Sequence, residues 1–174
     1  MRRTARTALR VVCATWYRVR SRNRIQGRSF LLRRPDSLDL SRGARVVIGR
    51  GTVIEAGARI VARGRLEIGE GVYIGKDVTL VAFGDLVIGD RALLAERVSV
   101  HTEDHGPAGD RLAYAIAPVT IGPDVWLGAG VVVTRGSVIG ARTTVGANAV
   151  VTRDLPDDVL AVGVPAKVVR SLAS

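Results

Sequence analysis

The stretch IGRGTVIEAGARIVARGRLE (residues 48–67) aligns without gaps with IGEGVYIGKDVTLVAFGDLV (68–87) and IGDRALLAERVSVHTEDHGP (88–107). An aliphatic residue returns at every sixth position of these blocks, and the same frame resumes after a break: Ile48, Ile54, Ile60, Ile68, Ile74, Leu80, Ile88, Leu94, Val100, Ile121, Leu127, Val133, Ile139, Val145 and Val151. A period of six fits neither a helical face nor simple strand alternation. It is intelligible as a short strand plus a turn, and three such units make one triangular coil.

Stacked coils of this kind bury a continuous core that no single coil could bury. The aliphatic residue that opens each hexad is expected to point inward. The fifth residue of each hexad is mostly small or Val, which suits a second inward position: Thr52, Ala58, Val72, Val78, Ala92, Val98, Val125, Val131, Thr143 and Ala149. The first three blocks have 20 residues instead of 18, so two extra residues are expected at one corner, near Gly64-Arg65 and Gly84-Asp85. We therefore predict an all-β protein, a parallel β-helix in the form of a triangular prism.

Composition agrees with one domain of this class. The 174 residues are 47% hydrophobic but only 4% aromatic, with 20 glycines, which suits many short strands. The single Cys13 excludes an internal disulfide framework and a cysteine-rich zinc site. We expect a basic arm at residues 1–34, the parallel β-helix at residues 35–156 with an inserted loop at 106–118, and a C-terminal tail at 157–174 that packs on the end of the prism.

The basic arm carries the whole charge excess. Residues 1–34 hold 11 arginines and no acidic residue, while the rest of the chain has 15 basic and 16 acidic residues, so no nucleic-acid partner is expected. Apolar residues recur at three- and four-residue steps, which predicts a basic amphipathic helix: Ala5, Ala8, Leu9, Val12, Trp16 and Val19. Such a helix could lie on an anionic membrane or pack on the domain or a neighbouring subunit. The apolar run at 11–17 is too short and too basic on its C-terminal side for a secretory signal, and no segment reaches transmembrane length. We expect a cytoplasmic protein, peripheral on the inner face of the membrane if the arm binds lipid.

The hexads, the segment PVTIGPDVWLGAG (118–130) and the tail VVTRDLPDDVLAVGVPAKVVR (150–170) resemble the hexapeptide-repeat acyltransferases, in the branch of maltose, galactoside and surface-polysaccharide O-acetyltransferases. The resemblance covers residues 36–172. It implies a left-handed parallel β-helix, assembly as a homotrimer whose prism faces beside the histidine loop pack around a threefold axis, and acetyl-CoA bound in the groove between neighbouring prisms.

The same resemblance places the family's catalytic histidine on His105, as the general base that deprotonates a sugar hydroxyl. His101 has no such counterpart. Glu103 and Asp104 could orient His105, and Arg111 and Tyr114 could touch the acceptor. Relatives of the galactoside type carry polar residues where Gly75 and Phe83 stand here, which weighs against simple galactosides.

The γ-class carbonic anhydrases share the fold implied by the resemblance, and they bind zinc through three histidines. This chain has two, His101 and His105, so no metal is expected.

The resemblance assigns seven residues to the binding of the acyl donor. The small ones among them would leave room for the pantetheine arm, and the cations would hold the phosphates. The seven residues are Trp126, Ala129, Ala147, Thr152, Arg153, Lys167 and Arg170.

Two classes of function follow. The first is O-acetyl transfer from acetyl-CoA to a sugar hydroxyl of a glycan, a glycolipid or their precursor, with N-acetylation of an amino sugar as its near variant. The second is a catalytically inactive trimeric β-helix scaffold. His105, Trp126 and the complete tail favour the enzyme, whereas the acceptor, the acyl chain and the pathway are not encoded in any recognisable motif.

Overall fold

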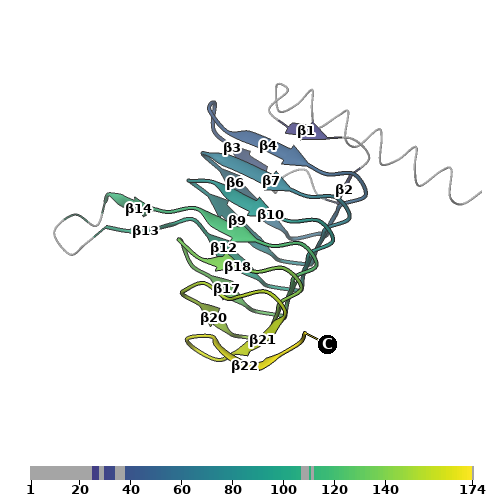
Figure 1. Ribbon diagram of the computed structural model, residues 1–174. Helices are drawn as coiled ribbons and strands as arrows, with labels where there is room; N and C mark the ends of the chain where they lie inside the picture. The colour runs from purple at the N-terminus through teal and green to yellow at the C-terminus, as the bar shows by residue number, and fades with distance from the viewer. Residues whose placement is uncertain (1–24, 28–29, 34–37, 107–109, 111, 174) are drawn as a thin grey trace, which may run out of the picture.

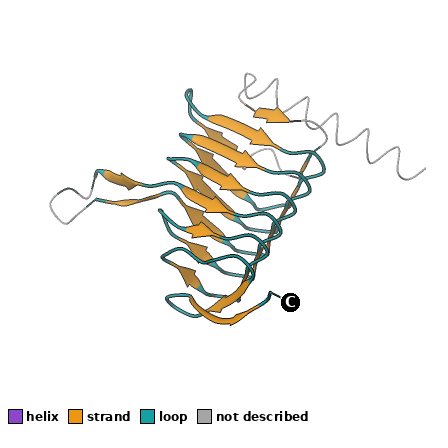
Figure 2. Cartoon of the chain, in the orientation of Figure 1, coloured by secondary structure: helices purple, strands orange, loops and turns teal. Residues whose placement is uncertain are grey.

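The computed structural model describes residues 25–27, 30–33, 38–106, 110 and 112–173. The amphipathic helix expected at the start of the arm lies outside these residues. The described chain winds as a parallel β-helix with three flat sides, so the predicted architecture is confirmed (Figure 1). It contains strands and turns throughout, and no described segment is a helix long and apolar enough to cross a membrane (Figure 2).

Each side of the prism is one sheet. The first face is, in spatial order, β1 (Ile25–Gly27), β4 (Arg45–Ile48), β7 (Arg65–Ile68), β10 (Leu86–Ile88), β15 (Val119–Ile121) and β18 (Val138–Ile139). The second face is β2 (Leu31–Leu32), β5 (Val53–Ile54), β8 (Tyr73–Ile74), β11 (Leu93–Leu94), β16 (Trp126–Leu127), β19 (Thr144–Val145), β21 (Val159–Val162) and β22 (Lys167–Ser171). The third face is β3 (Leu38–Leu40), β6 (Arg59–Ala62), β9 (Thr79–Ala82), β12 (Ser99–His101), β17 (Val132–Val133) and β20 (Val150–Val151).

The interior is filled by the two inward positions that the hexads predict. Every aliphatic residue that opens a hexad, from Ile48 to Val151, is at most 2% exposed. The same holds for the fifth residue of each hexad, from Thr52 to Ala149. The two inward threonines keep their hydroxyls hydrogen-bonded: Thr52 Oγ1 donates to the Gly69 carbonyl at 2.7 Å, and Thr143 Oγ1 donates to the Pro156 carbonyl at 2.6 Å. The core is therefore continuous along the prism and has no break where the hexads are interrupted.

The glycine that follows each Ile is fixed by close approach between coils. A Cβ on Gly122 would lie 2.7 Å from the backbone nitrogen of Ala141, and one on Gly49 would overlap the backbone of Gly69. Positive φ angles occur two residues after the glycines of one corner, at Gly51, Gly71, Arg91, Asp124 and Arg142, and the same column continues at Asp158.

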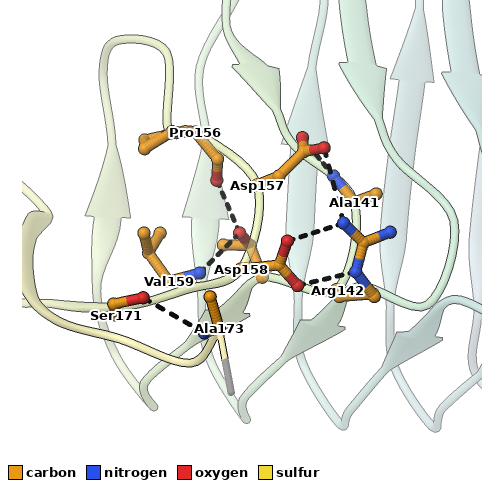
Figure 3. Close-up of polar contacts among 9 residues, drawn as sticks. Ala141, Arg142, Pro156, Asp157, Asp158, Val159, Ser171 and Ala173 are labelled. Atoms are coloured by element: carbon orange, nitrogen blue, oxygen red, sulfur yellow. Dashed lines mark hydrogen bonds and ion pairs between the residues drawn. The ribbon is translucent and has the colours of Figure 1, made fainter.

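The lower part of that column is a ladder of alternating charge. Arg91 donates two hydrogen bonds to Asp124 at 2.6 and 2.7 Å. One step further along the column, Arg142 donates two to Asp158 at 2.6 Å each, and Figure 3 shows this pair. The Arg91 and Arg142 guanidinium groups, through these hydrogen bonds, lower the pKa of Asp124 and Asp158 below the ordinary 3.8. Each coil at this corner thus holds its neighbour through opposite charges.

In the upper coils the two extra residues of each 20-residue block lie between the inward positions of the third and first faces, because Ile60 and Ile68 are eight residues apart and so are Leu80 and Ile88. They lengthen the strands on either side of the corner between these faces, and the corner itself is short. It takes up Arg63 and Gly64 in one coil, and Phe83, Gly84 and Asp85 in the next. In the third coil the same corner opens into an antiparallel hairpin, β13 (Glu103–His105) and β14 (Tyr114–Ile116), which projects sideways from the stack (Figure 1). At the far end, β22 pairs antiparallel with β21 and closes the second face.

Candidate active site

A cavity of about 370 Å³ lies where the hairpin leaves the prism. It is lined by His101, Glu103, Asp104, His105, Tyr114, Thr134 and Arg135. The root of the hairpin is anchored by the buried Thr102, whose Oγ1 accepts hydrogen bonds from the backbone N–H groups of Phe83 at 2.8 Å and Gly84 at 2.9 Å. The Ala117 N–H donates to the Thr102 carbonyl at 3.0 Å, so both strands of the hairpin leave from a fixed point.

His105 lies on the exposed side of β13, directly opposite Tyr114 on β14. Its ring stacks on the ring of Tyr114, with centroids 5.6 Å apart, and Phe83 contacts Tyr114 edge-on at 4.9 Å. These aromatic contacts stabilise one orientation of the imidazole. The carboxylate of Asp104 accepts a hydrogen bond from the His105 backbone N–H at 2.8 Å, which fixes the main chain at this position.

The ring of His101 has a carboxylate partner, Glu103, which the sequence also allowed for His105. Its Nδ1 lies 3.0 Å from Glu103 Oε1, and its Nε2 lies 2.7 Å from Ser99 Oγ. Ser99, His101 and Glu103 alternate along one side of the chain, which brings their side chains together. The second carboxylate oxygen, Glu103 Oε2, is buried with no hydrogen-bond partner among the described residues. The His101 ring is thus held by polar contacts, and the His105 ring stacks on Tyr114.

Thr134 and Arg135 were not among the predicted site residues. They follow β17, which pairs with β12 through Val133 and Val100, so they lie one coil below His101 at the same edge of the prism. A sequence signal for them exists: VVTRG (132–136) repeats as VVTRD (150–154), and Val132 and Val133 pair in register with Val150 and Val151. The position of Arg135 thus repeats that of Arg153, one coil closer to the histidines.

The predicted donor residues lie on the lower half of the prism. Trp126 is 53% exposed on the second face, and Ala129 and Ala147 follow it at one corner of successive coils, where the Asn148 N–H donates to the Ala129 carbonyl. Thr152 and Arg153 are exposed after β20, and Lys167 and Arg170 are exposed on β22. Only the acceptor candidates Glu103, Asp104 and Tyr114 line the cavity with His105. Arg111 lies outside the described residues.

This arrangement suits proton transfer at the edge of a groove. A neutral imidazole can accept a proton from a hydroxyl group within hydrogen-bond reach. Among the described residues, no group of three or more His, Cys, Asp or Glu side chains is placed to hold a metal ion.

Comparison with known proteins gives the same family as the repeats. Residues 118–153 match the family model of the bacterial transferase hexapeptide (six repeats). The galactoside O-acetyltransferase of Escherichia coli is 46% identical over 55 residues, which make up 32% of this chain and 27% of that protein. Such matches span less than half the length of the relatives concerned.

Solved structures extend the likeness to almost the whole chain. A hexapeptide-repeat-containing acetyltransferase of Vibrio cholerae superposes with a TM-score of 0.58 at 26% identity, covering 98% of this chain and 94% of that one. A maltose O-acetyltransferase of Clostridium difficile gives a TM-score of 0.58 at 27% identity, covering 79% and 67%. By its repeat, its prism and these relatives, the chain resembles the hexapeptide-repeat acyltransferases.

Proposed function

We propose that this protein transfers an acetyl group from acetyl-CoA to a hydroxyl group of a sugar. The observation that carries the proposal is the cavity at the root of the hairpin, in which His105 is held by Tyr114 in a chain that resembles the hexapeptide-repeat family. The relatives named above include galactoside and maltose O-acetyltransferases, which supports a sugar acceptor.

In the proposed reaction His105 accepts the proton of the sugar hydroxyl as its oxygen attacks the thioester carbonyl. The carbon–sulfur bond breaks as the tetrahedral intermediate collapses. The imidazolium returns the proton to the departing thiolate of coenzyme A, so protons and charge balance over the cycle. An amino sugar would follow the same course, with the amine as nucleophile, and O-transfer is favoured here by the names of the relatives.

Donor binding is proposed along the lower prism. Arg153, Lys167 and Arg170 are exposed cations with no ion pair among the described residues, and they are suited to the phosphates of coenzyme A. Ala129 and Ala147 would leave room for the pantetheine arm beside them.

Assembly as a homotrimer is part of the proposal. An apolar ladder runs down the outside of the second face through the paired residues Val53, Tyr73, Leu93 and Trp126. The last three are 39%, 40% and 53% exposed. In a ring each subunit presents two different surfaces to its neighbours, so this ladder would face the hairpin side of the next prism. The groove beside His105 would then be completed by the second copy.

The decisive experiment is an acetyl-transfer screen with purified protein. Acetyl-CoA consumption is followed with sugars and lipid-linked glycans, and the product is identified by mass spectrometry and by its sensitivity to mild base, which cleaves esters but leaves amides intact. An O-acetylated product supports the proposal. An amide product would favour the N-transfer variant, and the absence of transfer to any acceptor would favour the scaffold.

A further inference from the structure

Charges of one sign follow each other along the edge that carries the cavity, whereas charges of alternating sign follow each other along the corner of Arg91 and Asp124. In the column of Arg91, Asp124, Arg142 and Asp158, signs alternate from coil to coil and each arginine is bidentate to an aspartate. At the hairpin edge, Arg135 follows β17 exactly as far as Arg153 follows β20, so two arginines occupy equivalent places on successive coils. Like charges on neighbouring strands destabilise a sheet. Arg135 and Arg153 thus depart from the alternation of charge seen at the other corner, and departures of this kind are expected at functional positions.

No described residue neutralises either arginine. Arg135 and Arg153 are exposed and form no ion pair with any described residue. The acids that line the cavity with Arg135 contact other groups: Glu103 Oε1 lies 3.0 Å from His101 Nδ1, and Asp104 Oδ1 accepts a hydrogen bond from the His105 backbone at 2.8 Å. Arg135 is therefore a cation available to a ligand of the cavity.

The place of Arg135 decides which ligand it serves. It lines the same cavity as His105, where the transferred acetyl group must lie if the proposed function holds. The pantetheine arm separates the thioester of acetyl-CoA from its phosphates, so a donor whose acetyl group is at His105 carries its phosphates away from this cavity. An anion that reaches Arg135 would then belong to the acceptor.

We propose that Arg135 binds an anionic group of the acceptor, so that the substrate is a sugar bearing a phosphate or carboxylate close to the acetylated hydroxyl. This inference rests on the proposed function for the identity of the reaction. Guanidinium groups bind both anions through paired hydrogen bonds, and lysine reproduces their charge but not their planar geometry.

The test compares glucose 1-phosphate and glucuronate with methyl glucoside as acceptors, for the wild type and for Arg135→Gln, Arg135→Lys and Lys76→Gln. The wild type is expected to have a kcat/KM about 10- to 100-fold higher for the anionic sugars, the range that one charge-assisted contact gives. Arg135→Gln should lose this preference through KM for the acceptor, and Arg135→Lys should restore it in part. Lys76 is an exposed cation outside the cavity, so Lys76→Gln removes the same charge and should keep the preference.

Two outcomes would overturn the assignment while leaving the acetyltransferase intact. One is equal transfer to charged and neutral sugars by the wild type. The other is a rise in KM for acetyl-CoA, of the same size with every acceptor, in Arg135→Gln, because that would make Arg135 a donor contact.

Binding measured without acetyl-CoA separates this inference from the reaction itself. Calorimetric titration with glucose 1-phosphate and with inorganic phosphate should show binding to the wild type that Arg135→Gln loses and Lys76→Gln retains. If binding behaves in this way but no sugar is acetylated, the proposed function fails and the anion site stands. If the titration shows no difference between wild type and Arg135→Gln, the anion site is refuted.

Discussion

Glu103 Oε1 lies 3.0 Å from His101 Nδ1, and this contact joins the two titratable side chains on the prism side of the cavity. The carboxylate is largely buried, with a side chain 13% exposed, while the imidazole is 34% exposed. A buried carboxylate that loses its hydrogen-bond partner carries the full cost of desolvation. The pair therefore links the stability of the hairpin root to a residue that the proposed reaction does not use.

Replacing His101 by Ala should lower the free energy of unfolding by about 1–3 kcal/mol, because it leaves Glu103 without its partner. The double variant His101→Ala, Glu103→Gln should recover part of this loss, since a neutral amide is less costly to bury than a carboxylate. Urea denaturation of both variants measures the effect. Equal stability of wild type and His101→Ala would show that the contact contributes nothing.

Replacing His105 by Ala should lower the turnover of acetyl transfer by about 10²- to 10⁴-fold, the usual contribution of a positioned general base. The folded state should persist, because His105 is on the exposed side of the hairpin and outside the core. His101→Ala is the matched control, and it should lower turnover far less than His105→Ala does. Full activity in His105→Ala, with acetyl-CoA still consumed and the sugar product formed, would remove His105 from the mechanism.

Changes at Arg153, Lys167 and Arg170 to Gln should raise KM for acetyl-CoA and leave kcat nearly unchanged. Phosphate contacts far from the reacting carbonyl are made equally in the ground state and the transition state, so their loss weakens binding alone. Steady-state kinetics with acetyl-CoA as the varied substrate tests the triple variant. An unchanged KM would contradict the assignment of these cations to the donor.

Replacing Leu93 by Asp should break the proposed homotrimer and abolish the proposed transfer, because assembly would bury a charge in the middle of the apolar ladder. Val169→Asp is the control: Val169 is 55% exposed on β22, beyond the ladder at the end of the prism. Sedimentation equilibrium gives the mass of each variant. A wild type that sediments as an active monomer would end the proposal that a second copy completes the groove.

The charge ladder predicts acid sensitivity at one corner. The pKa of Asp124 and of Asp158 is lowered in the folded state by hydrogen bonds from Arg91 and Arg142. The resulting stabilisation is present above the ordinary aspartate pKa of 3.8 and is lost as pH falls through the lower folded-state value. Thermal melts between pH 6 and pH 2 should show a smaller drop for Asp158→Asn than for the wild type. Because these groups are exposed, added salt should reduce the difference.

The sequence predicted the scaffold better than the site, for a physical reason. A six-residue period determines which residues point inward, so Ile54 and Val98 could be placed in the core without coordinates. The same period says nothing about contacts across a bend, so it did not indicate that the Glu103 carboxylate contacts His101. Strand alternation over Ser99, His101 and Glu103 could have indicated the pair.

Two further features, the repeated VVTR segments and the glycines after Ile, are visible in the sequence, but their roles depend on the structure. The repeated VVTR segments were present in the sequence, yet Arg135 gains significance only once Val133 is seen to pair with Val100 beside the cavity. A glycine after Ile could serve a corner where the backbone needs a positive φ. At Gly49 and Gly122 the reason is contact with the next coil, since neither has a positive φ.

The hairpin leaves the prism between β12 and β15, and the coils close up behind it as if it were absent. Leu86 pairs with Val119 and Ile88 with Ile121 in the same register as the pairs above them, Leu86 with Leu66 and Ile88 with Ile68. A segment attached in this way can change length or composition without shifting a single rung of the sheets. The outer part of the hairpin can therefore diverge while the coils of the prism keep their register.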